Sequence, residues 1–271
     1  MPAKPTFRIS RFAALVLALS LVAISRAQKP TTQPSVTAAP EAQIIPPPAG
    51  YRFPDGQVHV FSVEWHLFTA GTAVVRMDPA GAQQRVTATA DSQGVVNTLF
   101  KVHDHFEALF DPKTFCSLHV TKHTEEGPRK KDTDVQFDYA RKKSVLNEKN
   151  LKTNETSHEE TDIPGCLTDV VTGFYYVASL PLQSGSIYNF TIGDRKITQV
   201  RATVQNREQI KVPAGSFHTV KVQAEAVSGT LKGKGAVTVW YTDDQNHTPV
   251  QMRSKLGWGT LLFRLQRLEA R

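Results

Sequence analysis

Two histidines two positions apart, His103 and His105, are the side chains in this sequence whose spacing best suits a metal ion. Side chains two positions apart on a strand share one face, and a pair of imidazoles is a common part of a zinc site. A complete site needs further ligands, for which His119 and His123 are the candidates. Phe106 alternates with the histidine pair, so the pattern places both histidines on a solvated strand face. We therefore predict no metal site.

Residues for acid–base or nucleophilic catalysis form no recognisable arrangement. The chain has no Gly-x-Ser-x-Gly motif. The adjacent acids Asp243 and Asp244 lie in an expected turn, and Glu159 and Glu160 lie in a charged stretch. A catalytic carboxylate pair needs separate environments that move the two pKa values apart, which neighbours in a solvated turn lack. The sequence predicts no catalytic residue and no cofactor, with a periplasmic hydrolase or a metal-dependent enzyme as the alternative.

Aromatic side chains are the remaining candidates for a functional site. Aromatic residues usually fill a core, but some would line a cavity if a curved sheet leaves space beside a helix, and ligand pockets of this kind usually exceed roughly 300 Å³. Tyr175 and Tyr176 are neighbours about 100° apart on an expected helix, so they cannot both face one interior. Our candidate ligand-binding residues are Trp65, Phe106, Phe110, Phe174, Tyr175, Tyr176 and Trp240.

Alternation of apolar and polar residues predicts that strands position these side chains. Phe61, Val63 and Trp65 are separated by Ser62 and Glu64, which is the pattern of a strand with one buried face. Similar short segments, separated by turn residues, recur to the end of the chain. We predict a mainly β fold with one large antiparallel sheet of about twelve strands, strongly curved or barrel-like.

One segment has helical spacing instead. Apolar residues recur every three or four positions from Leu167 to Ala178, before Pro181, and Asp169 can cap the first turn. We predict a single short helix over residues 167–180 that packs across the open face of the sheet.

The amino-terminal residues have the pattern of a secretory signal. Bases up to Arg11 precede an apolar run from Phe12 to Ile24, and Ser25 and Ala27 are the small residues that a signal peptidase reads. The apolar run is shorter than the roughly 20 residues that a membrane-spanning helix needs. We expect cleavage after Ala27, a periplasmic or secreted location, and no integral membrane span in the mature protein.

The expected domain organisation follows from a change in composition. The signal peptide covers residues 1–27, and a Pro-rich disordered linker covers residues 28–50, where no apolar periodicity is present. A single β domain covers residues 51–271.

Two cysteines, Cys116 and Cys166, lie 50 positions apart. Two thiols in an exported protein commonly form a disulfide, and two small buried thiols are the alternative. The sequence leaves both states open.

Net charge argues against a nucleic-acid partner. The formal charge is +7, but four of the 32 bases lie in the expected signal peptide, so 28 bases face 25 acids in the rest of the chain. Binding to phosphates requires a concentrated basic face, which this balance does not supply. The charged stretch at residues 141–161 is expected to form an exposed hairpin tip or a mobile loop.

Short motifs occur in the order of a bacterial exported family. They include Phe-x-Val-x-Trp at 61–65, Ala-Gly-Thr-Ala at 70–73, Asp-Val-Val-Thr-Gly-Phe-Tyr-Tyr at 169–176, Val-Pro-Ala-Gly-Ser-Phe at 212–217 and Trp-Tyr-Thr-Asp-Asp at 240–244. Over residues 53–268 the chain resembles the family called domain of unknown function 3108. The resemblance implies a single antiparallel β domain similar to the YmcC-like fold of envelope proteins, with no established activity and no agreed catalytic residues.

These patterns together favour a non-enzymatic protein of the cell envelope. We expect it to bind an apolar or amphipathic ligand, such as a lipid or a glycan, or an envelope protein.

Overall fold

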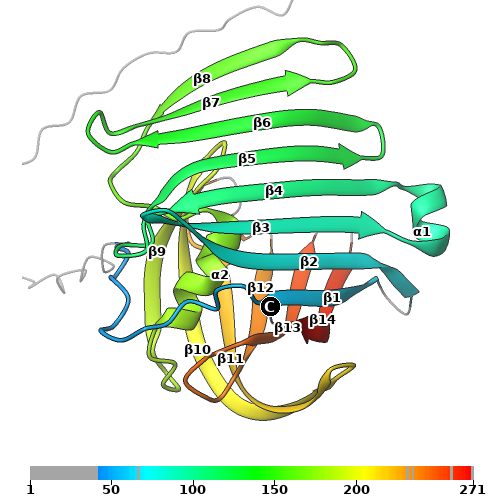
Figure 1. Ribbon diagram of the computed structural model, residues 1–271, viewed down its shortest axis with the longest axis vertical. Helices are drawn as coiled ribbons and strands as arrows, with labels where there is room; N and C mark the ends of the chain where they lie inside the picture. The colour runs from blue at the N-terminus through cyan, green and yellow to red at the C-terminus, as the bar shows by residue number, and fades with distance from the viewer. Residues whose placement is uncertain (1–41, 66–67, 230–231, 234, 257–258, 270–271) are drawn as a thin grey trace, which may run out of the picture. The chain divides into compact units, whose positions relative to one another are not determined.

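A computed structural model describes residues 42–269, except for 66–67, 230–231, 234 and 257–258. The fourteen strands of these residues form one antiparallel sheet in the order β8-β7-β6-β5-β4-β3-β2-β1-β14-β13-β12-β11-β10-β9 (Figure 1). This confirms the prediction of a mainly β fold with one large curved antiparallel sheet. The expected signal peptide and residues 28–41 of the expected linker lie outside the described residues.

The strands are joined mostly by short turns. The first eight are β1 (Val58–Trp65), β2 (Phe68–Ala80), β3 (Gln83–Ser92), β4 (Val102–Phe110), β5 (Ser117–Glu126), β6 (Arg129–Asp138), β7 (Lys143–Asn150) and β8 (Thr156–Asp162). The other six are β9 (Ile187–Gly193), β10 (Ile197–Val212), β11 (Gly215–Ala226), β12 (Ala236–Thr242), β13 (Pro249–Leu256) and β14 (Gly259–Glu269). The two helices are α1 (Gly94–Leu99) and α2 (Val170–Ser179).

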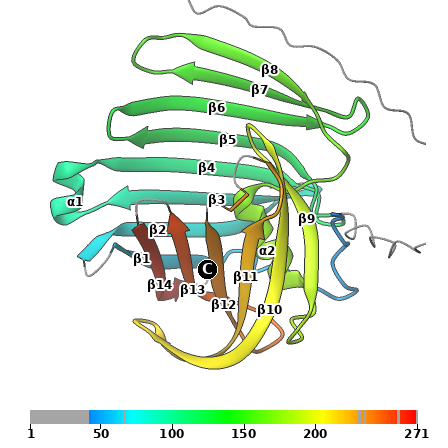
Figure 2. The same cartoon turned by 180° about the vertical axis from the view of Figure 1, so that it is seen from behind.

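The sheet curls around α2. Strands β2–β4 lie on one side of this helix and β9–β12 on the other, as both views show (Figures 1 and 2). The main core cluster contains buried side chains of both groups together with α2, among them Met77, Phe110, Tyr176, Val204 and Tyr241. Because each strand has one apolar face, curling brings two such faces against the same helix.

Asp169 starts α2 at the position that the sequence indicates. Its Oδ1 accepts hydrogen bonds from the backbone N–H groups of Val171 (2.9 Å) and Thr172 (2.8 Å), which would otherwise lack a helical partner. Leu180 has an extended backbone and ends the helix before Pro181. The predicted helix is therefore confirmed, and it occupies ten residues.

The segment before α2 joins two distant parts of the sheet. The backbone N–H of Ser117, at the start of β5, donates to the carbonyl of Leu167 (2.9 Å), while Thr168 forms a parallel bridge with Ile192 of β9. The Oγ of Ser117 also donates to Oδ2 of Asp169 (2.7 Å). These bonds fix the helix start between β5 and β9.

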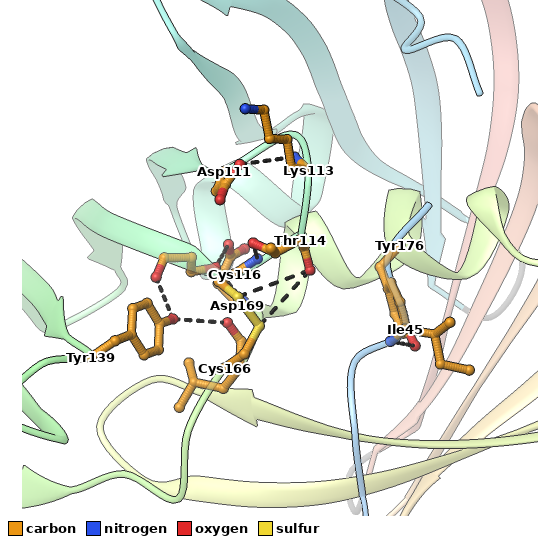
Figure 3. The surroundings of a disulfide bond; sticks show 11 residues. Ile45, Asp111, Lys113, Thr114, Cys116, Tyr139, Cys166, Asp169 and Tyr176 are labelled. Atoms are coloured by element: carbon orange, nitrogen blue, oxygen red, sulfur yellow. Dashed lines mark hydrogen bonds between the residues drawn. A yellow bond between two sulfur atoms is a disulfide. The ribbon is translucent and has the colours of Figure 1, made fainter. Parts of the chain in front are cut away.

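A disulfide reinforces this connection. Cys116 and Cys166 are bonded, with their Cα atoms 5.1 Å apart, directly beside the helix start (Figure 3). The Tyr139 hydroxyl donates towards the carbonyls of Ser117 (2.6 Å) and Leu167 (3.2 Å) in the same region. The structure thus contains the disulfide that the sequence left open.

Strands β5, β7 and β8 and helix α1 are additional to the predicted elements. No side chain of β8 is buried, and β5 and β7 carry many Lys, His, Glu and Asn residues. Strands of this composition lack the apolar alternation that identifies a strand in sequence. The stretch at 141–161 contains most of the β7–β8 hairpin at one edge of the sheet.

Residues just before Tyr51 pack against the domain. Ile44 is buried in the main core cluster, and the backbone N–H of Ile45 donates to the Tyr176 hydroxyl (3.1 Å). The backbone N–H of Gln43 donates to the carbonyl of Asn189 (3.0 Å). The packed part of the chain therefore begins inside the segment that the sequence predicts to be a linker.

Neither of the described helices is long and apolar enough to cross a membrane.

Candidate functional site

An apolar cavity lies between α2 and the inner face of β9–β13. This β10–β12 cavity has a volume of about 250 Å³ and is partly open to solvent. Its walls include Gly173, Phe174 and Val177 of α2, and Val200, Val222 and Val239 of three strands. Inward-facing β-branched residues on neighbouring strands make this wall almost entirely apolar.

A second apolar cavity lies on the other side of the helix. This β2–β4 cavity has a volume of about 220 Å³, and its lining includes Ala73, Ala88, Phe106, Phe174 and Tyr175. Small residues on β2 and β3 leave space that the larger neighbouring side chains do not fill. Asp104 is an acidic group of this lining, and burial raises its pKa, with the charge of Glu126 acting in the same direction.

Phe174 and Val239 line both apolar cavities. Each cavity alone is smaller than the roughly 300 Å³ that is usual for a ligand pocket. The space beside α2 is therefore divided into two adjoining cavities, and the half-buried Phe174 lies where they meet.

A third, polar space adjoins the β2–β4 cavity. This polar chamber has a volume of about 190 Å³ and lies among the residues before β1, the end of α2 and the β12–β13 turn. Tyr51, Arg52, Gln57, His59 and Asn246 contribute to its lining. Tyr175 and Pro249 line both the chamber and the β2–β4 cavity.

A buried histidine of the chamber lacks a hydrogen-bond partner among the described residues. His59 is only 1% exposed, and its Nδ1 forms no hydrogen bond with a described residue. Burial lowers the pKa of His59 to about 4, so the ring is neutral near pH 7. Burial is also the main cause that raises the pKa values of Tyr51 and Tyr175 above the ordinary phenol range. The chamber therefore offers neutral hydrogen-bonding groups in a desolvated space.

Three of the candidate ligand-binding residues line cavities. Phe106 lines the β2–β4 cavity, Tyr175 lines that cavity and the chamber, and Phe174 lines both apolar cavities. The neighbour Tyr176 is fully buried on another side of α2, where its ring lies 5.0 Å from that of Phe190. Tyr175 and Tyr176 thus face different surroundings, as their helical positions indicate.

The other candidates line none of the three spaces. Phe110 is stacked on Phe115 in the core, with ring centroids 5.4 Å apart. Trp240 is buried, and its Nε1 donates to Oε1 of Glu208 (2.7 Å). Trp65 is half-buried at the end of β1.

The histidine pair lies on the solvated face of β4, as predicted. His103 and His105 are both exposed, and His103 Nδ1 lies 2.6 Å from an oxygen of Asp91. His123 lies opposite His105 on β5, and its Nδ1 is 2.7 Å from an oxygen of Asp132. Each of these carboxylates contacts one imidazole. In the part of the chain that the structure describes, no three His, Cys, Asp or Glu side chains are grouped to hold a metal ion.

The sequence patterns did not indicate Gly173 as a site residue, nor any chamber residue except Tyr175. The chamber combines the segment before β1 with a turn almost 200 residues later in the chain, so no local pattern joins them. Gly173 interrupts a mostly apolar helix, which is a local signal that something packs close to it or that a space lies beside it.

Comparison with protein families identifies the chain. Residues 60–266 match the family model described as protein of unknown function DUF3108. The chain belongs to the DUF3108 family. This confirms the resemblance found in the sequence motifs, and the family's description names no activity. No curated protein matches the chain.

Solved structures are similar in fold. A β-barrel-like protein of the domain of unknown function DUF1849 from Brucella abortus has a TM-score of 0.57 at 8% identity, covering 85% of this chain and 99% of its own. A candidate exported protein with a YmcC-like fold from Bacteroides fragilis has a TM-score of 0.32 at 10% identity, covering 81% and 98%. A candidate lipoprotein from Parabacteroides distasonis has a TM-score of 0.34 at 12% identity, covering 81% and 97%. The Brucella protein supports the barrel-like fold.

Proposed function

We propose that this DUF3108 protein is an exported protein of the cell envelope that binds an apolar or amphipathic ligand around Phe174, without catalysing a reaction. The exported location rests on the signal pattern of residues 1–27. The binding role rests on the two adjoining apolar cavities beside α2. A ligand that displaces the Phe174 ring would join them into one elongated site.

The strand walls favour this role because they hold the cavities open. The β10–β12 cavity is lined by residues of five neighbouring strands, whose backbones are held together by antiparallel hydrogen-bonded ladders. Collapse of this space would require the sheet itself to bend inward. Apolar walls offer no hydrogen bonds to water, so an apolar ligand fills such a space better than water does.

Gly173 offers a way to fill the cavity without removing a core side chain. A Cβ at this position would lie 3.6 Å from Cγ2 of Thr168 and 3.8 Å from Cε2 of Phe190, which are ordinary contacts. The backbone is helical here, so a larger residue also improves helix propensity. In Gly173→Leu, the added side chain should therefore occupy ligand space while the domain stays folded.

The test measures binding of dansyl-undecanoic acid by fluorescence. We expect the probe to bind the wild-type protein with a blue-shifted emission and to lose about tenfold or more in affinity in Gly173→Leu, equivalent to about 1.4 kcal/mol. Leu99→Ala is the matched control, because Leu99 is 78% exposed on α1 and lines none of the cavities.

Two results would contradict the proposal. One is absence of probe binding to the folded wild-type protein. The other is equal binding by the wild-type protein and Gly173→Leu, since the probe would then lie elsewhere. Thermal unfolding of each variant shows whether a loss of binding reflects a loss of folding.

A further inference from the structure

The polar chamber continues the apolar site at one end. Tyr175 and Pro249 form the wall that the chamber shares with the β2–β4 cavity, and Phe174 joins that cavity to the β10–β12 cavity. The three spaces therefore adjoin one another in sequence through the lining residues that they share. An amphipathic molecule has the same sequence of parts, with an apolar chain that ends in a polar head.

Several polar groups of the chamber have no hydrogen-bond partner among the described residues. Nδ1 of the buried His59 has no hydrogen-bond partner among the described residues, and the hydroxyls of Tyr51 and Tyr175 have none either. The His59 and Tyr175 ring centroids are 6.3 Å apart. Leaving the buried Nδ1 of His59 unpaired costs free energy, so the chamber favours a polar occupant.

Charge decides which polar occupant fits. Arg52 lines the chamber, is exposed, and forms no ion pair with a described residue. Burial and, to a smaller extent, the charge of Asp55 raise the pKa of the nearby Tyr51. Asp55 does not line the chamber, and its Oδ1 accepts a hydrogen bond from Gln84. Asp104 lines the β2–β4 cavity and not the chamber, so its ionised carboxylate would disfavour an anion in that cavity more than in the chamber.

We propose that the chamber binds the carboxylate head of a single-chain fatty acid, whose acyl chain lies in the apolar cavities beside α2. This inference rests on the proposed function, because it assigns the head group of the same ligand. The Arg52 guanidinium can donate two parallel hydrogen bonds to a carboxylate. The Tyr51 and Tyr175 hydroxyls supply further donors.

The test compares two probes with the same chain, dodecanoate and dodecanol, by displacement of dansyl-undecanoic acid at pH 8. A charge-assisted hydrogen-bond pair distinguishes the ionised head from the neutral one. We expect dodecanoate to bind the wild-type protein about tenfold tighter than dodecanol, corresponding to about 1.4 kcal/mol. In Arg52→Gln this preference should disappear while dodecanol affinity is unchanged.

Arg201→Gln is the matched control. Arg201 also lacks an ion-pair partner among the described residues, and it lies between the buried Val200 and Ala202 on β10, so it faces away from α2. This variant should keep the preference for dodecanoate.

The outcomes separate the two proposals. Equal affinities for dodecanoate and dodecanol, unchanged in Arg52→Gln, would overturn the carboxylate assignment and leave apolar binding in place. An equal loss of preference in Arg201→Gln would also overturn it, because the effect would then be one of net charge. Binding of neither probe would overturn the proposed function together with this inference.

Discussion

The hydroxyl groups of two buried tyrosines have different surroundings, although the residues are alike in burial. The Tyr241 hydroxyl donates to the carbonyl of Phe174 at 3.0 Å, across the β10–β12 cavity wall. The Tyr175 hydroxyl forms no hydrogen bond within the part of the chain that the structure describes. Removing a partnered buried hydroxyl leaves an unsatisfied carbonyl, whereas removing an unpartnered one does not.

We therefore expect Tyr241→Phe to lower the free energy of unfolding by about 1 kcal/mol and Tyr175→Phe to change it by less than about 0.5 kcal/mol. Urea denaturation of the two variants and the wild-type protein measures both values. Equal destabilisation by the two substitutions would contradict the hydrogen-bond assignment.

The buried His59 should make the free energy of unfolding depend on pH. Its pKa is about 4 in the folded protein because of burial, against 6.5 when unperturbed. Between these values the unfolded chain binds more protons, so lowering the pH from about 6.5 to about 4 should reduce stability by up to about 3 kcal/mol. His59→Gln should lose this component, which urea denaturation at several pH values measures.

The exposed His218 is the control for this measurement. His218→Gln should keep the wild-type pH profile. A wild-type stability that is constant from pH 7 to pH 4 would show that His59 is not buried in the neutral form.

Residue types alone located part of the site. Phe106, Phe174 and Tyr175 were candidates because they are aromatic and lie on a predicted strand and helix, and all three line cavities. Neither Arg52 nor His59 has a local pattern that distinguishes it from a solvated residue, since the chamber forms only when a distant turn packs against them. Sequence patterns report which face of an element is buried, not which buried atoms lack partners.

Helix α2 is the element on which the site depends. Its position was predictable because apolar residues at helical spacing end at Pro181 and an aspartate stands at the first turn. The positions of strands β5, β7 and β8 were not predictable, because many of their side chains are charged and face solvent. These strands are defined by their hydrogen bonds to neighbouring strands. Elements stabilised mainly by their neighbours leave a weak local signal.

The cap of α2 should contribute strongly to stability. Asp169 accepts from two backbone N–H groups and from Ser117 Oγ while buried, so Asp169→Ala should cost about 2 kcal/mol. Gln93 precedes α1 without a capping side-chain bond, and Gln93→Ala should cost less than about 0.5 kcal/mol. Denaturation midpoints test the comparison, and similar costs at the two caps would contradict the role assigned to Asp169.

At the scale of the whole molecule, a single covalent bond reinforces the curl of the sheet. The Cys116–Cys166 disulfide joins the start of β5 to the segment that bridges to β9 and enters α2. A crosslink between residues 50 positions apart should contribute up to about 4 kcal/mol by restricting the unfolded chain.

We expect the Cys116→Ala, Cys166→Ala double variant to be less stable by a value approaching this limit, and to bind dansyl-undecanoic acid more weakly because the start of α2 is held less firmly. Denaturant unfolding and probe titration measure the two effects. Intact-mass measurement of exported wild-type protein should first show the loss of two hydrogens. Free thiols in that protein would contradict the bond.

The most direct test of ligand binding beside α2 is a crystal structure of the exported protein grown with dodecanoate. We predict continuous electron density through the two apolar cavities beside α2, past a displaced Phe174 ring, with the carboxylate beside Arg52 in the polar chamber. Dodecanoate bound only on the outer surface of the sheet, or apolar cavities closed by side chains with no ligand between them, would contradict the account.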